Sequence, residues 1–112
     1  MEQRGSTRIN VVGMEVDLPE KAGFRRGTLK DVSRSGVCLV GTPLKMHDKK
    51  SIVAVIVSAD GKRFSLQLRP KWEKQDELML VTGAMICDAP SEWMEMIMRL
   101  EREDEEAWSL TH

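Results

Sequence analysis

Apolar and polar residues alternate along much of the chain, with the period of two that is typical of β-strands buried on one face. The clearest alternation places Phe64, Leu66 and Leu68 on one side of a strand, and it continues through Pro70 to Trp72. Pro70 has no amide hydrogen to donate, so we expect a bulge or a sheet edge beside it. Together with short apolar runs, this period predicts six strands, at residues 12–18, 24–30, 37–41, 52–57, 63–72 and 78–87.

Two places depart from simple alternation. Residues 52–57 are apolar throughout, which predicts a strand covered on both faces. Leu29 and Val32 are three residues apart, and a regular strand cannot point both toward one face. We therefore expect the chain to leave a strand near Asp31, to turn, and to enter the next strand near Val37; Gly36 can take a positive φ in such a turn. Pro19 is expected to end the first strand.

The period changes after Pro90, where Ser91 is a suitable N-cap for a helix. Apolar residues then recur with i, i+3, i+4, i+7 spacing, at Trp93, Met96, Ile97 and Leu100. We predict an amphipathic helix over about 91–107 that frays in a solvated acidic run, 101–106. Its apolar stripe should cover the outer face of the strand at 52–57. The predicted fold is all-β, a six-stranded antiparallel β-barrel with a C-terminal α-helix packed on it.

The length and charge of the chain restrict the classes of protein to which it can belong. A chain of 112 residues suits one domain, and its formal net charge of −1 provides no general attraction to nucleic acid or an anionic membrane. No apolar run approaches the length of a membrane span. The first ten residues lack the apolar stretch of a signal peptide, so the cytoplasm is the expected location.

The residues that most often carry chemistry are sparse. Cys38 and Cys87 lie in apolar stretches and are interpreted as reduced thiols of the core. His47 and His112 have no neighbouring ligands at metal-binding spacing, so no metal site is predicted. Because no nucleophile–base pair is visible either, we do not expect an enzyme.

Two short motifs point to a binding function. Arg4 and Arg8 form Arg-x-x-x-Arg, and Asp31, Ser33 and Gly36 form Asp-x-Ser-x-x-Gly further along. In this order and in a β context, the motifs resemble those of the PilZ domain family. The resemblance extends to the stretches 69–72 and 83–86. It implies a six-stranded barrel with a C-terminal helix that binds the bacterial messenger cyclic di-GMP, with no other cofactor.

The resemblance also implies roles for the motif residues. Arg4 and Arg8 would contact guanine, stack on it, or bind phosphate. Asp31 would accept hydrogen bonds from a guanine edge, Ser33 would contact that edge or a phosphate, and Gly36 would let the backbone approach the ligand. A further candidate is Trp72, as a surface on which a base stacks, although a core residue at the end of the barrel is the favoured interpretation. Another is Gln3, which stands where family members often have a basic residue that affects ligand stoichiometry.

The predicted organisation is a mobile tail, residues 1–8, followed by a PilZ-like barrel and helix over 9–112. The favoured function is a cyclic di-GMP receptor that relays its signal by contact with an effector protein. Met94, Met98 and Trp108 form either an exposed apolar patch for that partner or only the margin of a wide buried stripe. The alternative is a PilZ-like adaptor that binds proteins without nucleotide. A barrel for single-stranded nucleic acid is a lesser alternative, because such barrels need more aromatic stacking platforms than two Phe, three Trp and no Tyr supply. No DNA or RNA partner is therefore expected.

Overall fold

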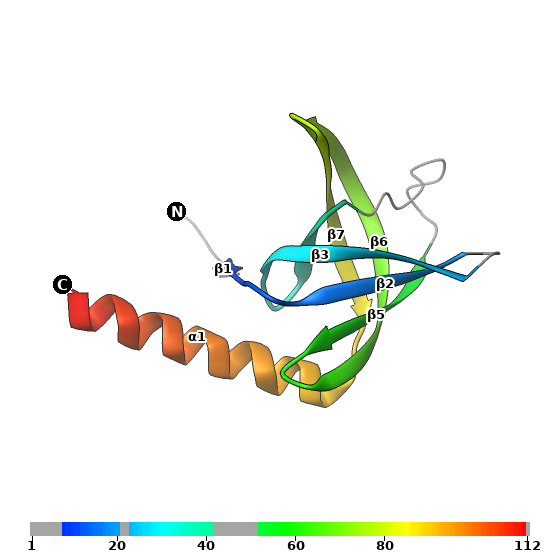
Figure 1. Ribbon diagram of the computed structural model, residues 1–112. Coiled ribbons are helices and arrows are strands. Elements are labelled where there is room, and N and C mark those ends of the chain that lie inside the picture. Colours follow the sequence, from blue (N-terminus) through cyan, green and yellow to red (C-terminus); the bar gives the residue numbers. More distant parts are fainter. Residues whose placement is uncertain (1–7, 21–22, 42–51, 112) are drawn as a thin grey trace.

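The computed structural model describes residues 8–20, 23–41 and 52–111. In this part of the chain, seven strands precede one helix (Figure 1). The elements are β1 (Ile9–Asn10), β2 (Glu15–Glu20), β3 (Gly23–Val32), β4 (Gly36–Val40), β5 (Val53–Ala59), β6 (Lys62–Asp76), β7 (Met79–Asp88) and α1 (Ser91–Thr111).

Six of the strands close into a barrel. The neighbours are β3, β2, β5, β6, β7 and β4 in that order, and an additional pairing between β4 and β3 completes the ring. All pairs are antiparallel. The predicted all-β fold, a six-stranded antiparallel barrel with a C-terminal helix, is confirmed. The short strand β1 is an addition that pairs with the end of β3, Ile9 opposite Val32 and Asn10 opposite Asp31.

The first predicted strand needs two corrections. The alternation placed Val12 on the buried face, but its side chain is 98% exposed. The chain bends outward there because Gly13 takes a φ of 84°, which glycine adopts without steric cost. Pro19 does not end the strand, because β2 continues to Glu20 and Pro19 is paired with Phe24.

A β-bulge in β3 explains the irregular spacing of Leu29 and Val32. Leu29 lies opposite Leu39 while Asp31 lies opposite Cys38, so Lys30 is an extra residue in β3. The bulge restores the phase of the strand, and both Leu29 and Val32 are buried. The strand therefore runs on to Val32 before the turn. Gly36 does not use the positive φ that is open to glycine, because its φ lies outside the left-handed region.

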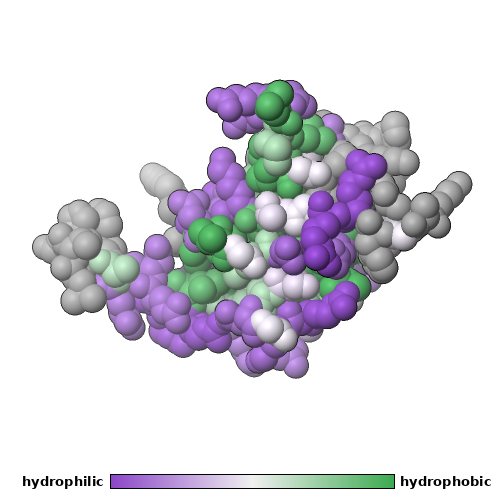
Figure 2. Space-filling view, viewed as in Figure 1, coloured by the Kyte–Doolittle hydropathy of each residue, from purple (hydrophilic) through white to green (hydrophobic). Residues whose placement is uncertain are grey.

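Strands β6 and β7 form a long hairpin that rises above the rest of the barrel (Figure 1). The expected bulge beside Pro70 is confirmed, since Pro70 faces Ala84 and Trp72 faces Gly83. The strands extend to a turn at 77–78, and β7 passes through Gly83 without interruption. A second bulge leaves Cys87 exposed, which corrects its assignment to the core. Hydrophobic and hydrophilic residues lie together at the tip of the hairpin, at the top of Figure 2. Leu78, in the turn of the hairpin, is 94% exposed.

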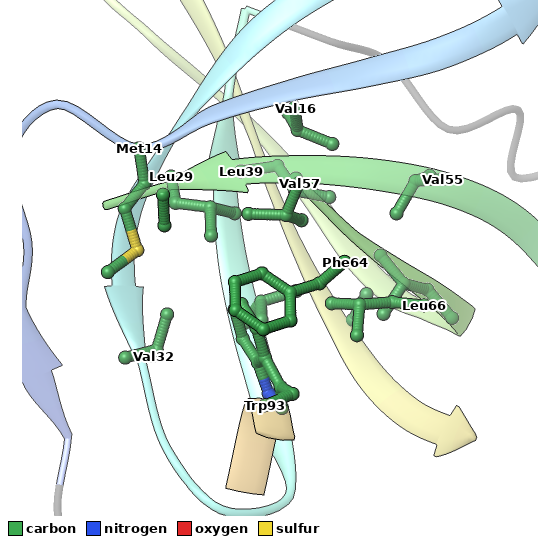
Figure 3. Close-up of a cluster of buried hydrophobic side chains, with 14 of the residues drawn as sticks. Met14, Val16, Leu29, Val32, Leu39, Val55, Val57, Phe64, Leu66 and Trp93 are labelled. Carbon is green, nitrogen blue, oxygen red and sulfur yellow. The ribbon is translucent and has the colours of Figure 1, made fainter. Parts of the chain in front are cut away.

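The helix closes one end of the barrel. Trp93, Met96 and Ile97 belong to the same buried cluster as the inward-facing strand residues. The rings of Trp93 and Phe64 meet edge to face with their centroids 5.4 Å apart (Figure 3). The helix does not cover the outer face of β5 as we expected, because Ala54 on that face is exposed. The sequence of β5 is apolar on both faces, but the residues of its outer face are small or only half-buried.

Beyond Leu100, α1 projects away from the barrel (Figure 1). The helix ends at Thr111 and not near residue 107, so the acidic run is helical. Its residues 102–107 are exposed, and the projecting surface is hydrophilic in Figure 2. No helix among the described residues is long and apolar enough to cross a bilayer.

Candidate functional site

The turn between β3 and β4 holds the Asp-x-Ser-x-x-Gly residues. The Ser33 amide donates to the Gly36 carbonyl at 2.9 Å, and the Ser33 hydroxyl accepts from the Gly36 amide at 3.1 Å. The same hydroxyl donates to the Gly36 carbonyl at 3.4 Å. Ser33 is only 3% exposed. In this structure its hydroxyl therefore stabilises the turn and is not directed toward solvent.

Gly36 is required by a close approach of two strands. A Cβ at this position would lie 3.0 Å from the Ala84 carbonyl oxygen, which is a backbone atom of β7. The neighbouring Ser35 carbonyl accepts a hydrogen bond from the Ile86 amide at 2.8 Å. The motif turn is thus fastened to β7, and the absence of a side chain at Gly36 permits that contact.

The two sequence motifs meet at Arg8 and Asp31. Strand β1 pairs with the end of β3, and this brings the residue before it, Arg8, to the Asp31 side chain. Arg8 Nη1 donates to Asp31 Oδ1 at 2.7 Å. The carboxylate side chain is 14% exposed and the guanidinium side chain 59%. Arg8 is therefore anchored on the barrel, whereas the other candidates in the predicted tail, Arg4 and Gln3, lie outside the described residues.

Trp72 forms a platform on the outer wall beside this pair. Its ring lies over Gly83, where a Cβ would come within 2.5 Å of Trp72 Cζ2 and nearer still to Cε2 and Nε1. The side chain remains 43% exposed. A large aromatic ring fits here only because the residue beneath it is glycine. The sequence candidate Trp72 thus lies with Arg8 and Asp31.

Two adjoining hollows surround this group, and Arg8 and Trp72 line both of them. The first, of about 280 Å³, is lined also by Lys30, Asp31, Cys38, Lys74, Asp76 and Val81. The second, of about 220 Å³, is lined also by Ser33, Ser35, Gly36, Lys71, Gly83, Ala84 and Met85. The motif residues from both parts of the chain therefore frame one continuous surface. The three lysines were missed in the sequence, because their position depends on the sheet register.

Cys38 lies in the wall of the first hollow. Burial, and then the nearby charge of Asp31, raises the pKa of its thiol above the ordinary 9.0. A thiol in this state is protonated at neutral pH and is a poor nucleophile. Cys38 thus contributes packing to the site, as expected for a reduced core thiol.

A contact that the sequence did not indicate joins the turn to the helix. Arg34, between Ser33 and Gly36, donates from Nε and Nη2 to the Glu101 carboxylate at 2.9 Å and 2.8 Å. Hydrogen bonding by Arg34 lowers the pKa of Glu101 below its ordinary 4.5. The Glu101 side chain is 14% exposed, so the prediction that it is simply solvated was wrong. No sequence signal gives this pair, because it depends on how α1 is placed against the barrel.

Comparison with known proteins gives matches in structure alone. No protein-family model and no curated protein matches the chain. The Bacillus subtilis inhibitor of motility MotI/DgrA superimposes with a TM-score of 0.75 at 11% identity. MrkH of K. pneumonia, solved as a c-di-GMP complex, gives 0.72 at 11%, and the PilZ domain of Escherichia coli YcgR, solved with c-di-GMP, gives 0.70 at 15%. The chain has the PilZ-domain fold.

The extent of these matches differs. The superposition covers 95% of this chain and 53% of MotI/DgrA, and 100% of this chain and 57% of MrkH. It covers 96% of this chain and 98% of the YcgR domain. The chain thus spans about half of the first two proteins and nearly all of the isolated PilZ domain.

The PilZ fold of this chain carries its polar site on the outside of the barrel. The described residues contain no group of three or more His, Cys, Asp or Glu side chains that could hold a metal ion. What the surface offers is a guanidinium, two carboxylates, an aromatic face and three ammonium groups. These groups suit a ligand that combines aromatic bases with anionic phosphates.

Proposed function

We propose that this protein binds cyclic di-GMP on the surface framed by Arg8, Asp31 and Trp72. The observation that carries the proposal is the Arg8–Asp31 contact, which joins the two motifs beside the paired hollows. The proposal is supported by two structural neighbours, MrkH and the YcgR PilZ domain, whose structures are described with c-di-GMP.

The chemistry of the ligand matches the side chains. Cyclic di-GMP presents two guanines and two phosphates. The Asp31 carboxylate can accept from guanine N1–H and the N2 amino group, and Arg8 can donate to O6 and N7 or to a phosphate oxygen. Trp72 offers an exposed aromatic face on which a base can stack. The ion pair holds the Arg8 and Asp31 side chains close together before the ligand binds. The bound ligand then either hydrogen-bonds to both side chains or takes the place of their mutual contact.

The remaining motif residues take two kinds of role in this proposal. Ser33 and Gly36 shape the turn and fasten it to β7, as their hydrogen bonds and close contacts support. Arg4 adds a second guanidinium from the preceding segment, with Gln3 beside it.

We also propose that α1 relays the signal to an effector protein. The Arg34–Glu101 ion pair connects the motif turn to the helix, so a shift of the turn changes the contacts that hold α1. Met98 is 41% exposed on the helix and Met94 is half-buried, which supports their use as an adaptable contact surface. Trp108 would extend that surface, although its side chain lies outside the described part of the chain.

Isothermal titration calorimetry with cyclic di-GMP tests the binding proposal. Arg8→Ala should weaken binding by about 10- to 150-fold, the usual value of a hydrogen bond to a charged group. Arg102→Ala is the matched control, since Arg102 is an exposed arginine of α1 that does not line either hollow. Its affinity should equal that of the wild type. A wild-type protein that does not bind at millimolar ligand overturns the proposal.

One observation favours the adaptor without nucleotide as the second candidate. The tip of the β6–β7 hairpin exposes Leu78 almost completely and Met79 by about half, and exposed apolar groups of this kind serve protein contacts. Failure of the wild type to bind nucleotide, with binding of a protein partner abolished by Leu78→Asp, would favour this reading.

A further inference from the structure

The bulge in β6 places Lys71 beside the candidate site. In a regular strand, neighbouring side chains point to opposite faces, so Lys71 and Trp72 would be separated by the sheet. Here Pro70 faces Ala84 and Trp72 faces Gly83, which leaves Lys71 as the extra residue. Both Lys71 and Trp72 consequently line the second hollow. Bulges often re-aim a side chain next to a functional site.

The two hollows differ in charge. The one with Lys71 also has Arg8, the serines of the motif turn and the backbone of β7, but no carboxylate among its lining residues. The other combines Arg8, Lys30 and Lys74 with the carboxylates Asp31 and Asp76. Lys71 is exposed and makes no salt bridge within the described residues. An anion is therefore favoured in the hollow of Lys71, and a group with hydrogen-bond donors in the hollow of Asp31.

We infer that Lys71 binds a phosphate of the ligand, and that the ligand is divided between the two hollows. This inference rests on the proposed function. A guanine lies in the hollow of Asp31, and the negatively charged phosphodiester lies in the carboxylate-free hollow between Arg8 and Lys71. Trp72 stands at the boundary, in reach of both. Lys71 thereby selects for a phosphodiester that is joined to the guanine.

Calorimetric titration of Lys71→Gln with cyclic di-GMP tests this role. Affinity should fall about 10-fold, as expected for loss of one charge-assisted contact, and the decline of affinity between 50 and 300 mM salt should become shallower. Lys71→Arg should keep affinity within about threefold of the wild type, because the positive charge is retained. Thermal midpoints without ligand should be unchanged, since Lys71 is exposed.

Lys62→Gln is the matched control. It removes the same charge from the same strand, but Lys62 is an exposed residue at the start of β6 that lines neither hollow. The control should weaken the binding of cyclic di-GMP by less than about threefold. A larger loss of affinity in Lys71→Gln therefore reports a direct contact with the ligand and not the change in the protein's net charge. Equal losses in the two variants, or none in Lys71→Gln, overturn the role of Lys71 while leaving the binding function intact. Absence of binding by the wild type overturns both.

Discussion

The contact between Trp72 and Gly83 gives a sharp test of how the site is built. In Gly83→Ala, the three atoms nearest to the new methyl group all belong to the Trp72 indole, and the closest separations are far inside van der Waals contact. The ring must withdraw by about 1 Å or more. It can do so, because its side chain is 43% exposed, but it loses packing on the sheet.

The cost can be estimated from the covered part of the ring. More than half of the Trp72 side chain is covered, which for an aromatic residue is roughly 100 Å² and at most about 2.5 kcal/mol. Overpacking typically costs about 1–3 kcal/mol. We therefore expect Gly83→Ala to lower the free energy of unfolding by about 1–2.5 kcal/mol, measured by urea unfolding followed by far-ultraviolet circular dichroism. Because Trp72 lines both hollows, affinity for cyclic di-GMP should fall as well.

A double-mutant cycle decides whether Trp72 is the cause. In the Trp72→Ala background the methyl group has space, and Gly83→Ala should be neutral or should stabilise by up to about 1 kcal/mol through the unfolded chain. If Gly83→Ala costs the same in both backgrounds, the indole does not pack on Gly83 as described here.

Three further predictions concern the helix and the ligand. Trp93→Ala should lower the free energy of unfolding by about 3–5 kcal/mol, because the ring is fully buried; a loss under 1 kcal/mol in urea unfolding would show that α1 does not close the barrel. Since Arg34 lowers the pKa of Glu101, their pair stabilises the fold at neutral pH, and this contribution is lost as the pH falls below 4.5 through the lowered pKa. Glu101→Gln should accordingly reduce the acid dependence of the unfolding midpoint, and an unchanged profile would argue against the pair. Asp31→Ala should weaken the binding of cyclic di-GMP and reduce the ratio of its affinity to that of cyclic di-AMP, both measured by calorimetry. If the variant keeps the full preference for the guanine ligand, Asp31 does not contact the base directly.

The sequence predicted the elements whose signal is local. The alternation from Phe64 to Pro70 matches the buried face of β6 because each strand residue points according to its own position in the pleat. The helix likewise begins at Ser91, as its capping signal predicted. These features depend on neighbouring residues only, so they can be read without knowing the tertiary structure.

The predictions that were wrong concern features that depend on the three-dimensional arrangement of the chain. The acidic run was predicted to be solvated, because Arg34, the partner of Glu101, lies 67 residues earlier in the chain. The helix was assigned to the outer face of β5, since the sequence does not distinguish an outer face from an open end of a barrel. Val12 was assigned to a buried face because its alternation with Met14 is regular, although Gly13 lets the chain bend between them.

The most informative failures are the breaks in alternation, because they lie at the candidate site. The register of β3 shifts at Lys30, and the register of β6 shifts at Lys71. Each bulge adds one residue to its strand, each added residue is a lysine, and the two lysines line the two adjoining hollows. A regular barrel would have buried Leu29 or Val32 but not both, and would have separated Lys71 from Trp72. The bulge in β3 keeps Leu29 and Val32 in phase with the core, and both bulges bring cations to the wall where Arg8 meets Asp31. Breaks of this kind, at positions where one face must stay buried, are where a binding surface can be sought in other barrels of this size.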